Sequence, residues 1–253
     1  MAGREICRQD KRVKTMENIS AYKRFKLFVS RILDKIAPSL LYGRYFYSQA
    51  GEDMLLSIYY EGKKHKGFYV DVGAHHPFRF SNTAYFYKRG WHGINIEPTP
   101  SLFKAFPRRR RRDINLNVGI GNGEKLTFYV FNDGALNTFD PALAKERDGS
   151  HDGKYKIVDR IEVQTYPLAE ILDKHLPAGT PIDLLTIDVE GFDYAVLKSN
   201  NWDKYVPEFI LVECESSLDD LSGDEIYKFL HERNYSIVGR TLYTTLFRHG
   251  EEQ

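Results

Sequence analysis

Three acidic residues of this chain stand where short apolar runs end. Asp71, Glu97 and Asp188 each lie within or directly after such a run. Runs of this length are typical of buried strands, and in open α/β sheets ligands bind outside the carboxyl ends of the strands. The three acids therefore predict a small-molecule site with carboxylates along its rim.

The turn after Asp71 leaves room for a ligand to approach the backbone. Gly73 has no side chain and tolerates unusual dihedral angles. The turn lacks the three spaced glycines of a dinucleotide fingerprint, which weakens the interpretation as an NAD site. Glu97, at the end of a second strand, is the residue type that binds the hydroxyls of a ribose, with a solvated acid as the alternative. The two features together favour an adenosine-containing ligand.

Asp188 and Glu190 flank the exit of another expected strand, beside Gly191. Acids at this place could orient a cationic ligand, act as a base, bind a metal ion or serve a structural role. With Glu213, at the end of a later apolar run, they could hold Mg²⁺, although the sequence does not show that the three converge. His75 is a further candidate base, with a hydrogen-bonded structural imidazole as the alternative.

Strands and helices that would position these residues alternate along the chain. We expect strands at 68–72, 94–97, 114–119, 124–131, 160–165, 182–188 and 208–214. We expect helices at 82–89, 100–107, 167–175, 192–199 and 222–233, then a hairpin of 235–238 and 241–248. This order predicts an α/β fold with a mostly parallel sheet, helices on both faces and an antiparallel C-terminal pair. Residues 132–159 are rich in loop-forming residues, and such long loops are often functional or mobile.

Two helices are expected before the first strand. From Ile19 to about Leu41, apolar residues recur at three- and four-residue steps with Lys and Arg on the other face, after a polar tail at 1–17. This amphipathic helix could pack on the domain or on a second copy of the chain, or attach to an anionic membrane surface. We therefore divide the chain into a basic tail and helix, 1–45, and a main domain, 46–253.

The second of these helices would be short and follow the basic segment. Ser48 could cap it, and Met54, Leu55 and Ile58 would then face inward. Its first-turn acids would compensate the helix dipole.

The composition is that of a globular domain with short appendages. The chain has 253 residues, 42% of them hydrophobic, and its 36 basic and 35 acidic residues nearly balance, so nucleic acid is not an expected partner. Arg108–Arg112 is either a solvated charge run or a site for an anionic partner. Cys7 and Cys214 make a poor disulfide framework, and neither a spanning apolar run nor a signal peptide is present. We expect a cytoplasmic protein, peripheral at the inner membrane face if the first helix binds lipid.

Seven short segments, in order over about residues 45–215, carry a resemblance to a known family. They are Ser48–Asp53, Tyr69–His75, Arg79–Thr83, Gly90–Pro98, Asp113–Val118, Ala135–Thr138 and Leu185–Gly191. In these segments the chain resembles the FkbM family of S-adenosylmethionine-dependent methyltransferases. The resemblance implies a Rossmann-like class I methyltransferase fold with a seven-stranded sheet, and O-methylation, often of a sugar hydroxyl.

The resemblance also implies roles for individual residues. Glu97 would bind the cofactor's ribose, and Asp188 would lie near the transferred methyl group. The methionine part would be lined by Asp71, Gly73 and Ala74, the adenine bordered by Asn117 and Val118, and the same pocket shared by Gln49, Ser81 and Asn82. His76–Pro77 departs from the small or acidic residue that relatives often carry after the first histidine.

A sugar hydroxyl is a poor nucleophile at neutral pH, so a base or a metal ion would help it to react. Asp188 is the first candidate base, followed by His75, Glu190 and Glu213. Two other functions stay open: an NAD(P)-dependent oxidoreductase, and a non-catalytic methyltransferase-like protein that assembles at a membrane through its N-terminal helix. The chain could also form a homo-oligomer.

Overall fold

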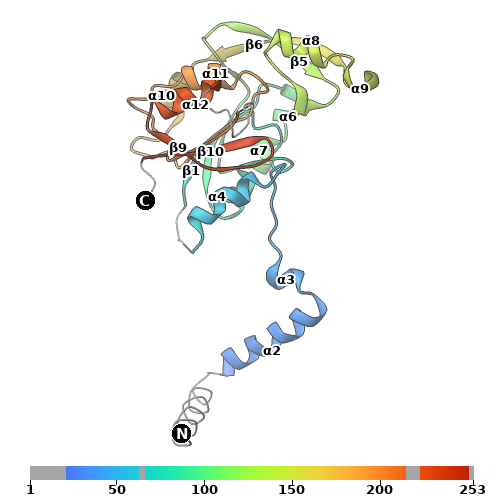
Figure 1. Ribbon diagram of the computed structural model, residues 1–253, viewed down its shortest axis with the longest axis vertical. Helices are drawn as coiled ribbons and strands as arrows, with labels where there is room; N and C mark the ends of the chain where they lie inside the picture. Colours follow the sequence, from blue (N-terminus) through green and yellow to red (C-terminus); the bar gives the residue numbers. More distant parts are fainter. Residues whose placement is uncertain (1–20, 63–65, 215–222, 251–253) are drawn as a thin grey trace, which may run out of the picture. The chain divides into compact units, whose positions relative to one another are not determined.

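The computed structural model describes residues 21–62, 66–214 and 223–250 (Figure 1). The chain divides into two compact units, Met1–Tyr45 and Phe46–Gln253. The first contains α2 (Ala21–Ile36) and α3 (Ser39–Tyr42), and α2 ends before Pro38, whose ring does not fit a helix interior. The predicted tail 1–17 and the start of the predicted helix at Ile19 lie outside the described residues. Among the described residues, no helix has the length and apolar character needed to cross a bilayer.

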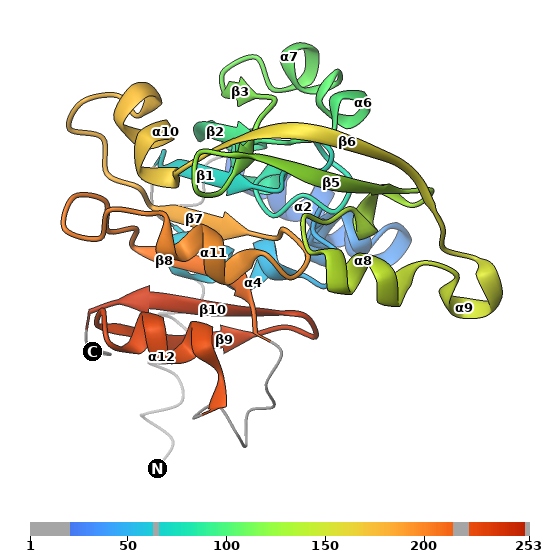
Figure 2. The ribbon, with the colours of Figure 1, turned by 90° about the horizontal axis from the view of Figure 1, so that it is seen from above.

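Seven strands form the main sheet of the second unit, in the order β3-β2-β1-β7-β8-β10-β9 (Figure 2). They are β1 (Phe68–Val72), β2 (His92–Ile96), β3 (Ile114–Leu116), β7 (Leu184–Ile187), β8 (Phe209–Glu213), β9 (Tyr235–Arg240) and β10 (Thr244–His249). Neighbouring strands are parallel from β3 to β8, and β10 is antiparallel to both β8 and β9. The α/β class, the largely parallel sheet and the C-terminal hairpin expected from the sequence are confirmed.

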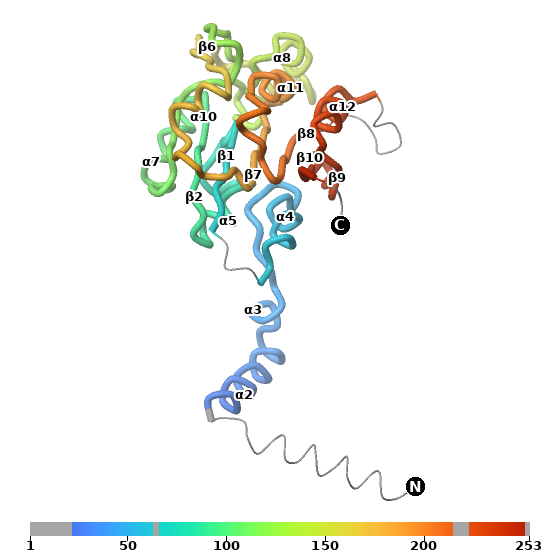
Figure 3. The backbone as a smooth tube through the Cα atoms, turned by 90° about the vertical axis from the view of Figure 1, so that its left-hand side faces the viewer, coloured from blue at the N-terminus to red at the C-terminus, as the bar shows by residue number. Residues whose placement is uncertain are grey.

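Helices cover both faces of this sheet (Figure 3). α4 (Glu52–Tyr60) and α5 (Ala84–Lys88) contribute to a core cluster that contains Tyr69 of β1. α10 (Leu168–His175), α11 (Asp193–Lys198) and α12 (Glu225–His231) contribute to another, which contains Val70. Successive side chains of a strand point to opposite faces, so β1 is buried on both sides. This explains why its sequence reads as a continuous apolar run rather than an alternation.

α4 packs Leu55 against the core cluster around Tyr69, as expected, but not Ile58. Ile58 is 61% exposed, whereas Glu52, Asp53 and Leu56 are buried. The Ser48 hydroxyl donates a hydrogen bond of 2.8 Å to the Asp53 carboxylate, which also accepts one from a backbone N–H. The prediction that Ile58 faces inward is wrong, because the two acids of the first turn take inward positions and find hydrogen-bond donors there.

A second, three-stranded sheet has the order β4-β6-β5. It consists of β4 (Gly119–Ile120), β5 (Lys125–Phe131) and β6 (Ile157–Tyr166), with β6 parallel to β4 and antiparallel to β5. The predicted strand 114–119 is therefore two strands that serve different sheets. The expected loop 132–159 instead contains η1 (Gly134–Leu136), α8 (Pro141–Arg147) and α9 (Ser150–Gly153), and the expected helix 100–107 is α6 (Pro100–Phe103) and α7 (Phe106–Arg109).

Candidate active site

A pocket lies at the carboxyl ends of β1, β2 and β7, with an empty volume of about 730 Å³ that includes open solvent. Ends of neighbouring parallel strands meet at one edge of a sheet, so acids from distant parts of the sequence come together there. The pocket is lined by ten of the residues predicted for the site: Gln49, Asp71, Gly73, Ala74, His75, Ser81, Asn82, Glu97, Asp188 and Glu190.

Gly73 brings the end of β1 against the end of β7. Its φ of 83° lies in the left-handed region, and a Cβ at this position would lie 1.8 Å from the carbonyl oxygen of Asp188. The Asp188 N–H donates to the Val72 carbonyl at 3.0 Å, and the N–H groups of Gly73 and Ala74 both donate to the Ile96 carbonyl at 3.0 Å. The turn is held from both neighbouring strands, and any side chain at Gly73 would push them apart.

Glu97 is buried and held by two backbone groups. One carboxylate oxygen accepts a hydrogen bond from the His75 N–H at 2.8 Å, and the other accepts one from the Thr99 N–H at 2.7 Å. Burial raises the pKa of Glu97 to about 7, although the hydrogen bonds from Thr99 and His75 oppose the shift. Each oxygen keeps a second lone pair, so the carboxyl group can still accept a hydrogen bond from a ligand hydroxyl.

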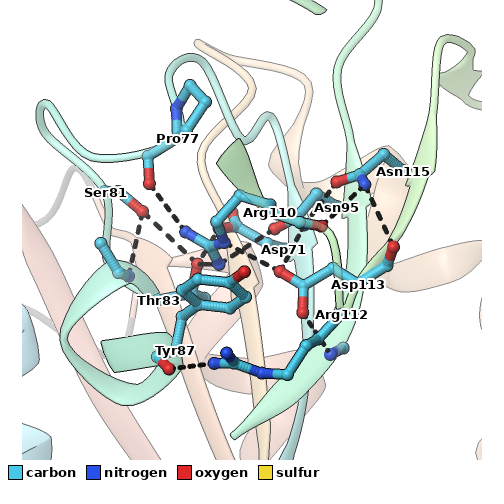
Figure 4. A network of polar contacts seen from close by, with 12 residues as sticks. Asp71, Pro77, Ser81, Thr83, Tyr87, Asn95, Arg110, Arg112, Asp113 and Asn115 are labelled. Carbon is cyan, nitrogen blue, oxygen red and sulfur yellow. Dashed lines mark hydrogen bonds and ion pairs between the residues drawn. The ribbon is translucent and has the colours of Figure 1, made fainter. Parts of the chain in front are cut away.

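Asp71 is held through a hydroxyl and a guanidinium. Thr83 Oγ1 donates to Asp71 Oδ2 at 2.6 Å, and Arg110 Nη2 donates to Thr83 Oγ1 at 2.7 Å (Figure 4). A guanidinium can only donate, so it directs the single Thr83 proton toward Asp71. Burial raises the pKa of Asp71 to about 6, against the lowering effects of Thr83 and Arg110.

Arg110 belongs to the basic run Arg108–Arg112 but is fully buried. Its Nε pairs with Asp113 at 2.8 Å, and its terminal nitrogens donate to the Pro77 carbonyl and the Tyr69 hydroxyl (Figure 4). Neither interpretation of the run, a solvated charge cluster or an anion site, describes this residue. Its neighbours in the run stay exposed, because Arg110 alone points toward the buried acids of the sheet edge.

Asp188 lines the pocket at the end of β7. Burial raises its pKa well above the usual value, and the charges of Glu213 and Glu190 act in the same direction. Glu190 has a φ of 52°, and its carboxylate pairs with Arg147 at 2.6 Å. Burial also raises the pKa of Glu190, while Arg147 opposes the shift. The pocket is therefore lined by more acidic than basic side chains, a surplus of acids. A positively charged ligand would stabilise their ionised forms.

Residues 71–237 match the family model of the Methyltransferase FkbM domain. The chain belongs to the FkbM methyltransferase family. Among solved structures it is similar to the crystal structure of Methyltransferase FkbM from Methylobacillus flagellatus KT, with 16% identity and a TM-score of 0.42. That alignment covers 74% of this chain and 44% of the other. A search of the curated proteins found no match.

The predicted metal site of this FkbM family member is not supported. In the part of the chain that the structure describes, no group of three or more His, Cys, Asp or Glu side chains is placed to hold a metal ion. The physical reason lies partly at Glu190, whose carboxylate is engaged by Arg147. The charges of Glu213 and Glu190 instead raise the pKa of Asp188.

His75 lines the pocket with a φ of 49°. Burial lowers the pKa of its imidazole, and the nearby Arg79 acts in the same direction. At neutral pH the ring is therefore uncharged and can accept a proton. A base at His75 stays a prediction.

Asn117 and Val118 are not among the lining residues of this pocket. The Asn117 side-chain amide donates to the backbone carbonyls of Glu97 at 2.7 Å and Pro98 at 3.0 Å. It therefore supports the backbone that carries Glu97. Contact of Asn117 and Val118 with an adenine ring stays a prediction.

Nine lining residues were missed by the sequence reasoning, namely Phe80, Pro98, Thr99, Phe128, Gly134, Ala135, Asn137, Phe139 and Val189. Asn137 belongs to a segment that carries the family resemblance, and its amide donates to Thr99 Oγ1 at 3.1 Å and accepts from the Phe131 N–H at 2.8 Å. That segment could have drawn attention to it. Phe128 and Phe139, whose rings pack 4.5 Å apart, carry no such signal, because they reach the pocket only through the fold of the second sheet.

Proposed function

We propose that this protein is an S-adenosylmethionine-dependent O-methyltransferase that acts on a hydroxyl group of a sugar or glycan. The observation that carries the proposal is the meeting of Asp71, Glu97 and Asp188 in one pocket at adjacent strand ends, in a chain of the FkbM family. Apolar and aromatic walls with a few convergent polar groups are typical of small-molecule sites.

The residues present fit this cofactor. Gly73 lines the pocket, and its lack of a side chain lets the backbone of Asp188 approach the β1 turn, so that Asp188 reaches the same pocket. Glu97 offers lone pairs to the two hydroxyls of a ribose. When bound, the cofactor would supply a methyl group on a positively charged sulfur, which is already open to attack by an oxygen. The acid surplus of the pocket favours such a cation.

Asp188 is the residue that we propose takes the proton from the acceptor hydroxyl. Burial raises the pKa of Asp188 well above its usual value, which favours the protonated form in the free protein. A nearby positive charge lowers the pKa of a carboxyl group, so a bound cation would prepare Asp188 to act as a base. The pocket walls would align the hydroxyl and exclude water. The neutral imidazole of His75 is the second candidate for the proton acceptor.

Titration calorimetry tests the cofactor directly. The full chain is titrated with S-adenosylmethionine, S-adenosylhomocysteine and NAD, in buffers of different ionisation enthalpy. We expect both sulfur compounds to bind, NAD not to bind, and protons to be released with S-adenosylmethionine as the buried acids ionise. Glu97→Ala should weaken binding at least about tenfold, because hydrogen bonds to a charged group contribute roughly 1.5–3 kcal/mol. Binding of NAD alone would instead support the oxidoreductase.

The acceptor class requires a separate measurement. Mass spectrometry of glycans from cells with and without the protein should show a difference of one methyl group. If the purified protein transfers methyl groups but glycans are unchanged, the cofactor assignment stands and the sugar acceptor is rejected.

A further inference from the structure

The N-terminal unit differs from the main domain in its charge. Residues 1–45 contain 11 Lys and Arg against 4 Asp and Glu, a net charge of +7. The remaining residues contain 25 Lys and Arg against 31 Asp and Glu, a net charge of −6. The overall net charge of +1 is therefore the sum of two segments of opposite charge. An anionic surface would attract the first unit and repel the main domain.

α2 carries much of this positive charge on an amphipathic helix. Its apolar side chains recur at three- and four-residue steps and form one stripe, Tyr22, Phe25, Phe28, Val29, Ile32, Leu33 and Ile36. Tyr22, Phe25, Phe28 and Ile36 are each more than half exposed. The only other helix described in this unit is α3, which has four residues. Among the described residues 21–45, little can therefore cover the stripe.

Three of the five cations of α2 lie along the edges of the stripe. With about 100° between successive residues, Lys26 falls beside one edge, and Arg24 and Lys35 fall beside the other. Long basic side chains at the edges of an apolar face can extend their charges to lipid headgroups while the face enters the acyl boundary. Asp34 is the one acid on the helix, and it falls on the face opposite the stripe.

We propose that α2 is a membrane-docking surface that lies in the interface of an anionic phospholipid bilayer. A second copy of the chain is a poorer occupant, because a helix with five cations and one acid would meet the same cations across the pair. The inference goes beyond the proposed methyl transfer and does not rest on it. It assigns the protein a place at lipid surfaces.

Two adjacent residues supply a matched test. Phe28 lies within the stripe, whereas Leu27 lies on the polar face, and both are more than half exposed. Phe28→Asp and Leu27→Asp change the charge equally within the same helix. The full chain and both variants are sedimented with vesicles of phosphatidylcholine alone, and with vesicles that also contain phosphatidylglycerol.

We expect the wild-type chain to sediment with the anionic vesicles only, and less at high salt. Phe28→Asp should weaken this binding at least about tenfold, because an apolar side chain of that size contributes roughly 1.5–3 kcal/mol on burial. Leu27→Asp should retain most of it. Equal losses in the two variants, or no binding of the wild type, would overturn the proposal. Analytical ultracentrifugation without lipid tests whether a second copy of the chain covers the stripe instead. A wild-type dimer that is lost only in Phe28→Asp, together with no vesicle binding, would assign the stripe to a second copy.

Discussion

Asp188 shows how the environment of one residue sets its role. An isolated aspartate would be ionised at neutral pH, but burial among other acids raises the pKa of Asp188 well above its usual value. Because a nearby positive charge would lower that pKa again, a cationic ligand in the pocket would favour the ionised form of Asp188.

Asp188→Asn tests that role. The amide has the shape of the protonated acid, so we expect the fold to be unchanged and cofactor binding to change by less than about tenfold. Turnover should fall by roughly 10²–10⁴, the usual contribution of general acid–base catalysis. Single-turnover assays with calorimetry separate the two quantities. Wild-type turnover in the variant would transfer the base role to His75.

Arg110 is a buried cation on which the geometry of Asp71 depends. Removing one partner of a buried ion pair leaves the other charge uncompensated and costs about 3–5 kcal/mol. We expect Arg110→Met to lower the free energy of unfolding by that amount, measured by urea denaturation. Arg109→Met is the matched control from the same run, and because Arg109 is exposed its effect should stay within about 1 kcal/mol. Similar losses in the two variants would mean that Arg110 is solvated.

At the scale of elements, the site depends on the contact between the β1 turn and the end of β7. That contact is made by backbone, through the Asp188 N–H and the Val72 carbonyl, so a side chain can only disturb it. The strand ends must be this close for Asp71 and Asp188 to share one pocket.

Gly73→Ala should separate the two strands. A left-handed φ costs an L residue roughly 1–2 kcal/mol, and the added Cβ would in addition meet a backbone oxygen at 1.8 Å. Gly179→Ala is the control, because Gly179 has a similar φ of 74° and nothing within 4 Å of the added Cβ. We expect Gly179→Ala to cost about 1 kcal/mol, and Gly73→Ala to cost several and to abolish cofactor binding. Equal costs in urea denaturation would show that the turn relaxes freely.

At the scale of the whole molecule, buried acids make stability depend on pH. The pKa is raised to about 7 for Glu97 and to about 6 for both Asp71 and Asp193. In the unfolded chain these groups titrate near pH 4, so between pH 4 and 7 the native state binds more protons. The free energy of unfolding contributed by these groups therefore falls as pH rises through this range and is highest below pH 4.

Glu97→Gln isolates one share of that dependence. The glutamine side chain cannot ionise, so the variant does not lose the free energy of unfolding that Glu97 costs the wild type as pH rises toward 7. We expect the difference in free energy of unfolding, variant minus wild type, to increase by about 1 kcal/mol or more from pH 4 to 8. Denaturation curves across this range measure it, and any constant offset from the altered hydrogen bonds cancels. A pH-independent difference would contradict a raised pKa.

Much of the fold and the centre of the site could be predicted from the sequence. The apolar run that ends at Val72 and the small turn at Gly73 are local signals, and they mark a strand end wherever the chain is placed. The exposure of Ile58 could not be predicted in the same way, because helical periodicity does not say which face meets the sheet. Nor could the division of 114–119, since both halves have a strand-like sequence and only pairing assigns them to different sheets.

By itself, the sequence determined the type and order of the elements and the acids at their ends, because apolar runs, turn residues and motif spacing act over short distances. It thereby indicated that Asp71, Glu97 and Asp188 would share one edge of a parallel sheet. Only the tertiary structure decided that Arg110 is buried, that Glu213 joins no metal-binding group among the described residues, and that burial raises the pKa values of the pocket acids. These properties depend on how much protein surrounds each charge, and packing brings that protein from distant parts of the chain.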